Sequence, residues 1–436
     1  MKRFSVWFAI VGGLLMACPQ TAEAQGAPVE QAVLNGRVAD VLAVLQGRRA
    51  ESDVFNRNFL IEVSPEKLAA IVSQLEAQLG KLTGAKLTGA TGPGPASVEL
   101  QFERATVAAV IALDPAAQRL VSGFRIVSVG AVSNVAGSAT KSIADEFASM
   151  PGSAGFAVAR LDDSGPTMLD ARLPDQLFAI GSAFKLWVLD AVVEDVANGR
   201  LSWAQVVPLG ARSLPSGVMQ DWPAGMPITV ETLATQMISI SDNTATDTLI
   251  RLVGRARVEA RVKASGHSQP AAMHPFLTTS DAFRLKLAPQ TTRDAYARSD
   301  GAGRSKIVND LPVGIAAAQT DISGLAGGKP VAIDSIEWFA APFDMVRVLD
   351  ALRRRSDPQV MAILGVAPGM APELRRTFSS VGYKGGSEPG VLNLSWLLRR
   401  PSGTWYAVTA SWNNPAAALD NSRLEWLAQR LIAQTK

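Results

Sequence analysis

Ser182 and Lys185 place a hydroxyl and an amine one helical turn apart, at the start of a strongly apolar helical run. Residues 184–193 are apolar on nearly every side, which is typical of a helix buried in a core. Burial lowers the pKa of a lysine, and the neutral amine can then accept the proton of a serine hydroxyl. Ser182 would also lie at a helix N-terminus, where backbone N–H groups favour a developing negative charge. The pair predicts a lysine-activated serine nucleophile; the alternative is a capping serine and a lysine that reaches solvent.

The S-x-x-K spacing also occurs at residues 64–67 and 138–141, so the sequence context has to separate the three copies. Ser64 precedes a proline, which predicts a helix cap with proline at the first helical position. Ser138 lies in a stretch of small residues, 130–142, that predicts a linker. Because only Ser182 opens an apolar helical run, Ser182 is the predicted nucleophile.

Two further motifs follow Ser182 in the chain. Ser241-Asp242-Asn243 leads into a predicted helix that reaches Val253, and Lys384-Gly385-Gly386-Ser387 follows a predicted strand edge. Taken singly, the first could be a helix cap and the second a strand that ends in a turn. Taken together, in the order S-x-x-K, S-D-N and K-[STG]-G, the three motifs are far less likely to be accidental.

Residues 143–436 therefore resemble the catalytic domain of the serine β-lactamase and penicillin-binding-protein superfamily, and most closely the class A β-lactamases. The segment 228–233, which leads into residues 241–247, adds to the likeness. The resemblance implies an α+β fold with an antiparallel sheet flanked by helices and an all-helical subdomain. It also implies a secreted hydrolase that opens β-lactams or related amides and esters through a Ser182 acyl-enzyme.

The resemblance implies a role for each motif residue. Ser182 attacks the substrate carbonyl, and Lys185 is the general base. Ser241 passes a proton to the leaving nitrogen, while Asn243 holds Lys185 and contacts the substrate amide. Lys384 supplies positive potential for a substrate carboxylate and helps to keep Lys185 neutral.

The same resemblance places an oxyanion hole at the backbone N–H groups of Ser182 and Ser387. Gly385 and Gly386 allow a close approach of the substrate there. Asp242 is expected to brace its loop and not to react.

One part of the class A pattern is missing. Class A enzymes use a glutamate after the S-D-N motif to activate the deacylating water, but residues 273–281 contain no E-x-x-L-N pattern, and Asp281 is expected to be a helix cap. A D,D-peptidase or esterase on the same fold is therefore a second hypothesis, and a non-catalytic cell-wall binding protein is a third. Residues 288–335 are also longer than a compact class A domain requires, and Ser299-Asp300-Gly301 is expected to be a turn.

The two histidines, His267 and His274, are not in a nucleophile-elbow context, so we expect packing roles and no Ser-His-Asp triad. The only cysteine, Cys18, lies in the leader, so no metal site and no cofactor are expected. The expected partner is a small β-lactam, ester or peptidoglycan-like substrate. A formal charge of +3 gives no reason to expect nucleic acid, and the oligomeric state is not indicated.

A chain of 436 residues predicts two domains. Lys2 and Arg3 precede an apolar stretch and a small-residue site, so residues 1–24 are a predicted signal peptide and the product is secreted or periplasmic. Lipoprotein attachment at Cys18 is the alternative, and the mature chain should have no transmembrane segment. Residues 25–130 form a predicted accessory domain, 131–142 a linker and 143–436 the hydrolase domain.

Periodicity indicates a small α+β accessory domain, of the curved-sheet kind seen in NTF2-like proteins. In this domain we expect helices over 28–46 and 65–79, a loop over 84–95, and strands over 98–102, 105–113 and 119–128. Near the C-terminus we expect strands over 391–398 and 405–412 and a helix over 416–434. Strands at both ends of the hydrolase domain would form one antiparallel sheet, with a helical insert between them.

Overall fold

The computed structural model describes residues 31–89, 96–114, 119–129, 142–213, 216–311, 328–355 and 357–435. The chain divides into two compact units, residues 1–140 and 141–436. The predicted signal peptide, Cys18 and the S-x-x-K copy at 138–141 lie outside the described residues. Within the described ranges, no helix is long and apolar enough to cross a membrane.

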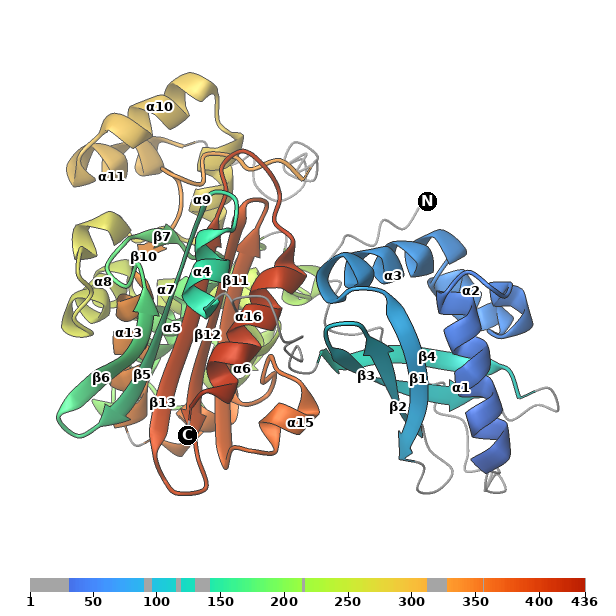
Figure 1. The fold of residues 1–436 in the computed structure, drawn as a ribbon. Coiled ribbons are helices and arrows are strands. Elements are labelled where there is room, and N and C mark those ends of the chain that lie inside the picture. The colour runs from blue at the N-terminus through green and yellow to red at the C-terminus, as the bar shows by residue number, and fades with distance from the viewer. Residues whose placement is uncertain are drawn as a thin grey trace. The chain divides into compact units, whose positions relative to one another are not determined.

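The N-terminal unit is a four-stranded antiparallel sheet, in the chain order β1-β2-β3-β4, with helices packed against it (Figure 1). Its elements are α1 (Gln31–Leu45), η1 (Glu51–Asp53), α2 (Arg57–Glu62), α3 (Pro65–Leu79), β1 (Leu82–Gly89), β2 (Ala96–Phe102), β3 (Thr106–Leu113) and β4 (Val121–Val129). Val98 and Leu100 of β2 are buried and alternate with Glu99, as the sequence predicted. They belong to one apolar core with Val38 and Val41 of α1. The likeness to NTF2-like proteins stays a prediction.

One prediction in this unit was wrong. Residues 84–89 are not a loop but part of the edge strand β1, which pairs with β2 from Leu82↔Phe102 to Gly89↔Ser97. The pairing shifts register between Leu82 and Gly84 and again between Leu87 and Gly89. Glycine offers no side chain to alternate between the two faces, so an edge strand with glycines at its irregular points gives little sequence signal. Residues 90–95 of the predicted loop lie outside the described residues.

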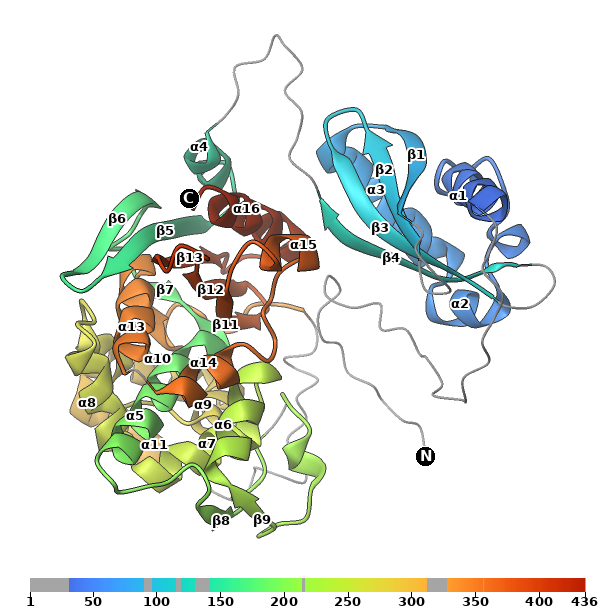
Figure 2. The ribbon, with the colours of Figure 1, turned by 90° about the horizontal axis from the view of Figure 1, so that it is seen from below.

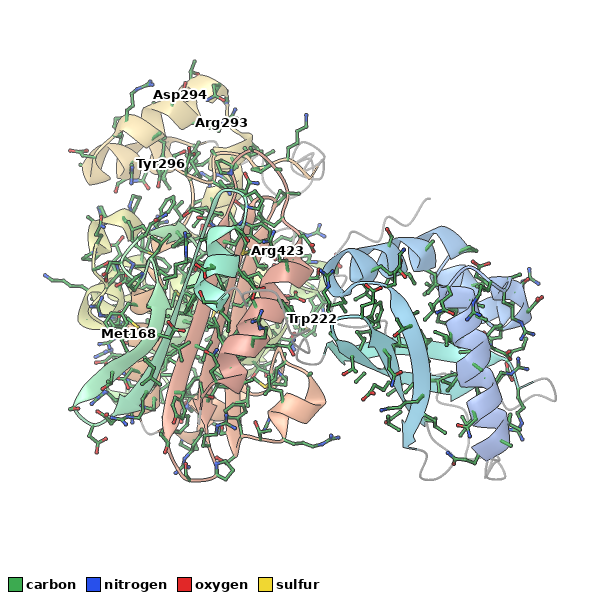
Figure 3. The ribbon with its side chains drawn as sticks, viewed as in Figure 1. Met168, Trp222, Arg293, Asp294, Tyr296 and Arg423 are labelled. Carbon is green, nitrogen blue, oxygen red and sulfur yellow. The ribbon has the colours of Figure 1, made fainter. Side chains whose placement is uncertain are left out.

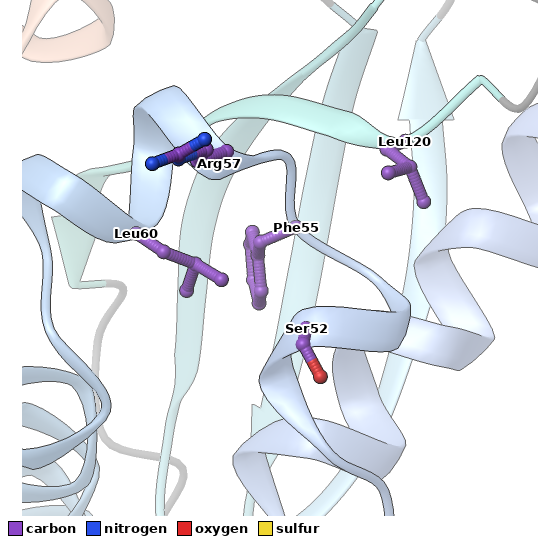
Figure 4. Close-up of a pocket in the computed structure, with 5 residues that line it drawn as sticks. All are labelled: Ser52, Phe55, Arg57, Leu60 and Leu120. Atoms are coloured by element: carbon purple, nitrogen blue, oxygen red, sulfur yellow. The ribbon is translucent and has the colours of Figure 1, made fainter.

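The N-terminal unit contains a cavity of about 440 Å³ (Figure 4). Its lining is mostly apolar, and Phe55 stacks on Phe59 with ring centroids 4.4 Å apart. No residue of the predicted catalytic set lines it. The lining residues are Ser52, Phe55, Arg57, Leu60 and Leu120.

The C-terminal unit is built on a five-stranded antiparallel sheet in the order β11-β12-β13-β5-β6 (Figures 1 and 2). Strands from both ends of the unit thus lie side by side, and the predicted α+β architecture is confirmed. The two expected C-terminal strands form within one residue of the predicted bounds. The strands are β5 (Ser153–Asp162), β6 (Gly165–Arg172), β11 (Ser380–Glu388), β12 (Val391–Arg399) and β13 (Trp405–Asn413).

Helices cover both faces of this sheet (Figure 2). On one face of β5, Phe156 and Val158 pack toward α4 (Ile143–Ala148) and α16 (Asn421–Ala433). On the other face, Ala157 and Ala159 belong to the core that includes α5 (Lys185–Ala197) and α13 (Pro342–Arg354). Arg423 of α16 donates a hydrogen bond of 2.8 Å to the Ser149 hydroxyl after α4 (Figure 3). α16 begins at Asn421 and not at residue 416, because residues 414–420 form a turn-rich connection.

The helical insert between β6 and β11 carries the middle of the chain. Its helices are α6 (Val230–Ser239), α7 (Asn243–Val253), α8 (Arg255–Ala264), α9 (Thr279–Leu287), α10 (Gln290–Arg298) and α11 (Gly301–Asp310), followed after α13 by α14 (Pro358–Leu364) and α15 (Pro372–Arg375). The unit also contains two short two-stranded sheets, β7 (Phe178–Ala179) with β10 (Phe339–Ala340) and β8 (Val206–Pro208) with β9 (Pro227–Thr229). Its 3-10 turns are η2 (Gly181–Phe184), η3 (Met219–Asp221) and η4 (Pro270–Met273).

α10 and α11 form a helical pair in the long segment after α9. Tyr296 of α10 is buried, and the Arg304 guanidinium of α11 lies 5.2 Å from its ring centroid (Figure 3). The predicted turn at 299–301 is a helix start: Asp300 caps α11, and its side chain accepts a 2.8 Å hydrogen bond from Gly303 N.

Candidate active site

Ser182 lies in the turn η2, which neighbouring elements hold from several directions. β7 leads into the turn, and Asn413 at the end of β13 brackets Ala179 with side-chain hydrogen bonds of 2.8 and 2.9 Å. Behind the turn, Phe184 stacks on Trp338 with ring centroids 3.7 Å apart. Ser182 is only partly buried, so its side chain keeps access to solvent while its backbone is fixed.

Lys185, the first residue of α5, is completely buried. Its Nζ donates hydrogen bonds to Ser241 O (2.7 Å), Ser241 Oγ (3.0 Å) and Asn243 Oδ1 (2.8 Å). Burial lowers the pKa of Lys185 well below its ordinary value, and the charge of Lys384 lowers this pKa further. Among the described residues, no carboxylate forms an ion pair with this amine, so the neutral form is favoured.

Ser241 joins the two predicted catalytic lysines. Its φ is 59°, in the left-handed region that residues other than glycine seldom adopt. Its hydroxyl accepts hydrogen bonds from Lys185 at 3.0 Å and from Lys384 at 3.1 Å. Such strained conformations persist where the surroundings impose them, and they cluster at functional sites. The two amines and one hydroxyl form a path along which a proton can move.

Asp242 ties a loop to the start of α7. As the N-cap residue, it accepts hydrogen bonds from Ala245 N (2.8 Å), Val218 N (2.7 Å) and Met219 N (2.8 Å). A side chain on Gly217 would place its Cβ 2.6 Å from Asp242 Cα. The Asp242 carboxylate thus holds the loop and the start of the helix together.

Lys384 lies on β11, which is an edge strand of the sheet, as expected. It is 3% exposed, and its Nζ also donates to Gly385 O at 2.6 Å. Burial lowers the pKa of Lys384 to about 7. The charge of Lys384 therefore changes close to neutral pH.

The free edge of β11 lies against the turn η2. A Cβ added to Gly386 would lie 2.5 Å from the backbone nitrogens of Ser182 and Ala183, and one added to Gly181 would lie 3.0 Å from Ser387 N. Gly181 has a φ of 48°, which also favours glycine. The structure thus brings together the two backbone nitrogens, of Ser182 and Ser387, that the sequence assigned to an oxyanion hole.

One expected contact is not formed. Within the described part of the chain, the Ser182 hydroxyl makes no hydrogen bond with Lys185, whose Nζ is engaged by Ser241 and Asn243. Hydrogen bonds between catalytic groups are often long before substrate binds, so this geometry is compatible with proton transfer during the reaction.

Both histidines have partners away from Ser182. His267 Nε2 lies 3.0 Å from Phe339 O, and its Nδ1 accepts a 3.1 Å hydrogen bond from Gln269 N. Burial lowers the pKa of His267. His274 Nδ1 lies 3.1 Å from the Glu259 carboxylate.

Asp281 occupies a structural position. It forms a capping box with Thr278, with hydrogen bonds of 3.0 Å in both directions. The start of α9 also docks on Asp247, which accepts hydrogen bonds from Thr279 N (2.8 Å) and Ser280 N (3.0 Å). No carboxylate in the described part of this region forms a hydrogen bond or ion pair with Ser182 or Lys185.

Sequence reasoning missed Asn413 and a group of three charged residues beside Gly181. Glu337 Oε2 accepts a hydrogen bond of 3.2 Å from Gly181 N, and Lys286 bridges Glu337 and Glu388. Glu337 and Glu388 lie 51 and 102 residues from Lys286, so no local spacing could reveal the cluster. The one signal was the placement of charges between apolar neighbours, as in Leu285-Lys286-Leu287.

The sheet, the helical insert and the order of the three motifs define a catalytic domain of the serine β-lactamase and penicillin-binding-protein superfamily. The chain belongs to the β-lactamase enzyme family, whose model matches residues 138–424. A comparison with curated proteins found no match.

Several solved structures are similar to this chain. A β-lactamase from Sphaerobacter thermophilus is 22% identical, with 67% of this chain and 95% of that chain covered and a TM-score of 0.45. PBP-A is 16% identical, with 66% and 91% covered and a TM-score of 0.44. A β-lactamase from Chitinophaga pinensis is 17% identical, with 67% and 95% covered and a TM-score of 0.43.

Proposed function

We propose that the C-terminal unit is a serine hydrolase of the class A β-lactamase type, which opens β-lactams or related amides and esters through a Ser182 acyl-enzyme. The observation that carries this proposal is the Ser241 hydroxyl held between Lys185 Nζ, at 3.0 Å, and Lys384 Nζ, at 3.1 Å. In the described residues neither amine is paired with a carboxylate. Burial and the charge of Lys384 outweigh the opposing charges of Asp247 and Asp242 on Lys185, which favours a neutral proton acceptor next to the nucleophile.

Acylation then forms one C–O bond, breaks one C–N bond and passes a proton stepwise from Ser182 to the leaving nitrogen. The Ser182 oxygen bonds to the substrate carbonyl carbon as its proton moves to neutral Lys185. The carbonyl oxygen becomes an oxyanion that faces the backbone N–H groups of Ser182 and Ser387. The C–N bond of the amide breaks as Ser241 gives its proton to the leaving nitrogen and recovers one from Lys185.

Lys384 has a second role in substrate binding under this proposal. Its amine contacts Ser241 Oγ and Gly385 O and has no carboxylate partner in the described structure, so a substrate carboxylate would be its counter-ion. Asn243, which accepts a hydrogen bond from Lys185, would contact the substrate amide.

A D,D-peptidase or esterase is a second candidate, and one observation favours it. Hydrolysis of the acyl-enzyme needs a base for water, and no described carboxylate forms a hydrogen bond or ion pair with Ser182 or Lys185. A slow deacylation step suits an enzyme that passes its acyl group to another acceptor or cleaves activated esters. A non-catalytic binding protein is disfavoured, because recognition alone gives no reason to keep Lys185 buried without a counter-charge.

The test follows hydrolysis of a chromogenic cephalosporin and the intact mass of the protein over time. Turnover without a lasting adduct supports the β-lactamase, and a lasting adduct on Ser182 supports the peptidase or esterase. Ser182→Ala should abolish both signals, whereas Ser64→Ala, in the other S-x-x-K copy within the described chain, should keep them. Adduct formation by Ser182→Ala would refute this nucleophile.

Secretion is also part of the proposal, on the basis of the leader sequence. Export from a bacterial host should yield a mature chain that begins at Gln25. A lipid-modified Cys18 at the N-terminus would support the lipoprotein alternative, and an unprocessed Met1 in the cytoplasm would contradict both.

A further inference from the structure

Lys286, Glu337 and Glu388 form a buried ionic cluster next to the turn that carries Ser182. Lys286 lies on α9, Glu337 precedes β10, and Glu388 ends β11. Lys286 Nζ lies 2.8 Å from Glu337 Oε1 and also pairs with the Glu388 carboxylate. The side chains of Lys286 and Glu337 are 2% exposed, and that of Glu388 is 17% exposed. Three separate elements thus meet at one amine.

Each carboxylate is attached to one side of the candidate oxyanion hole. Glu337 Oε2 accepts the 3.2 Å hydrogen bond from Gly181 N, and Gly181 directly precedes Ser182. Glu388 directly follows Ser387 on β11. Lys286 therefore links the backbone segment that supplies one N–H group to the segment that supplies the other.

We propose that this cluster positions the oxyanion hole, so that Lys286, Glu337 and Glu388 are positioning residues for the acylation of Ser182. The inference rests on the function proposed above, and it adds a group that the S-x-x-K, S-D-N and K-[STG]-G motifs do not contain.

The backbone geometry supports this role. Alternate residues of a strand face the same side, so Lys384, Gly386 and Glu388 of β11 share one side. Lys384 contacts Ser241, Gly386 packs on the Ser182 backbone, and Glu388 reaches Lys286. Contacts along one side of β11 therefore hold this strand at three places: Ser241, the Ser182 backbone and Lys286.

The opposite side of the hole is fixed in a similar way. The pairing of β7 with β10 continues through a hydrogen bond of 3.0 Å from Ile180 N to Trp338 O. One residue further on, the Glu337 side chain takes the place of a backbone carbonyl and accepts the Gly181 N–H. The turn η2 is thereby anchored up to the residue before the nucleophile.

The charge of the cluster matters because the oxyanion forms beside it. One amine faces two carboxylates, so full ionisation would leave an excess negative charge there. Burial, together with the charge of Glu337, raises the pKa of Glu388 well above its ordinary value, and Lys286 opposes this rise. This shift favours the protonated form of Glu388, and with Glu388 protonated the cluster carries no net charge.

Lys286 remains protonated in this arrangement. Burial alone would lower the pKa of Lys286, but the two carboxylates outweigh burial and raise it. Lys286 on α9 and Glu337 before β10 are the titratable groups that act on Glu388. The turn η2, of sequence Gly-Ser-Ala-Phe, contributes no titratable group apart from the nucleophile.

The first test compares Glu388→Ala with Glu388→Gln. Glu388→Ala leaves Lys286 and Glu337 as a balanced pair, so the fold should persist, but the link to β11 is lost. We expect the rate constant for acylation by a fluorescent penicillin to fall about 10- to 100-fold, with the dissociation constant of the non-covalent complex changed less than about twofold. Glu388→Gln keeps the link and mimics protonated Glu388, so it should acylate at the wild-type rate at pH 6.

Asp310→Ala is the matched control, because it removes a carboxylate from an exposed lysine pair on α11. It should acylate like the wild type. Wild-type rates for Glu388→Ala, or an equal loss in Glu388→Gln, would overturn the positioning role.

The second test uses pH. As pH rises, Glu388 of the wild type ionises and places a negative charge beside the oxyanion, whereas Glu388→Gln stays neutral. Lys384 loses its charge in both proteins, so the ratio of the two acylation rates isolates Glu388. The acylation rate of Glu388→Gln divided by that of the wild type should increase with pH. A constant ratio would overturn the protonation of Glu388 in the cluster.

Failure of the cluster can be told apart from failure of the proposed function. If the wild type is labelled and Ser182→Ala is not, unchanged rates in the Glu388 variants count against the cluster alone. If a penicillin and a fluorophosphonate both fail to label the wild type, the proposed function fails. The pH dependence of unfolding then still tests whether Glu388 is protonated. Because the pKa of Glu388 is raised in the folded protein, Glu388 stabilises the fold below pH 4.5, and this stabilisation is lost as pH rises. An identical pH dependence of unfolding in wild type and Glu388→Gln would overturn the proposal.

Discussion

Lys185 and Lys286 lie in the same unit and are both buried, but their surroundings differ completely. Around Lys185 the partners are a hydroxyl, a carbonyl and an amide oxygen, and a second amine lies nearby. Around Lys286 the partners are two carboxylates. The pKa of Lys185 is lowered by burial, whereas that of Lys286 is raised by its partners in spite of burial.

The comparison shows that burial alone does not decide what a lysine can do. A buried amine without a counter-charge gives up its proton easily and can act as a base. A buried amine between carboxylates keeps its proton and holds elements together. The same substitution should therefore damage mainly acylation at Lys185, and at Lys286 mainly stability, with a smaller loss of acylation.

The largest effect is expected from Lys185→Met, which removes the proton acceptor next to Ser182. We expect the acylation rate to fall about 10³-fold or more, since general bases contribute on the order of 10² to 10⁴. The free energy of unfolding should change by about 1 kcal/mol or less, because loss of a costly buried amine offsets the lost hydrogen bonds. Stopped-flow labelling and urea unfolding measure the two quantities. Acylation within about tenfold of the wild type would assign the base to another group.

Lys286→Met should show the reverse balance. It leaves the buried Glu337 carboxylate without a cation, so the free energy of unfolding should fall by about 3 to 5 kcal/mol. Urea unfolding of the single variant and of the double variant Lys286→Met/Glu337→Gln checks the cause. The double variant should recover part of the loss because it removes the uncompensated charge. No recovery would mean that packing, and not charge, explains the loss.

Lys384 is a third buried lysine, and it extends the comparison to substrate binding. With a pKa of about 7, it is protonated below neutral pH and loses its charge as pH rises. The KM for a carboxylate-bearing cephalosporin should therefore rise about tenfold between pH 6 and pH 8.5, which corresponds to the loss of one charged hydrogen bond. The methyl ester of the same compound is the control. An equal rise in KM for the ester would show that Lys384 does not bind the carboxylate.

The sequence predicted those parts of the molecule in which a local pattern carries the structure. Alternation marked β2, strand-like residue runs marked β12 and β13, and a proline after Ser64 marked the start of α3 at Pro65. In the candidate site, the S-D-N motif and the K-G-G motif lie where the predicted helix and strand edge place them. These features need only neighbouring residues, so a single sequence contains them.

The rest depends on contacts between distant segments. The left-handed conformation of Ser241 is imposed by its surroundings, and no residue type announces it. Asn413 reaches β7 across 234 residues, and Lys286 meets partners from two other elements. β1 was missed because glycines interrupt its alternation. The contacts of Asn413 and Lys286 become visible only when the fold brings distant segments of the C-terminal unit together.

The smallest effect is expected from Lys306→Met, which completes the comparison with an exposed lysine. Lys306 pairs with Asp310 on α11, and their side chains are 78% and 61% exposed. Water solvates both charges with or without the pair, so the free energy of unfolding should change by less than about 0.5 kcal/mol and acylation should be unchanged. Urea unfolding and penicillin labelling test both statements. A loss similar to that of Lys286→Met would mean that ion pairing itself, and not burial between carboxylates, makes a lysine structural in this domain.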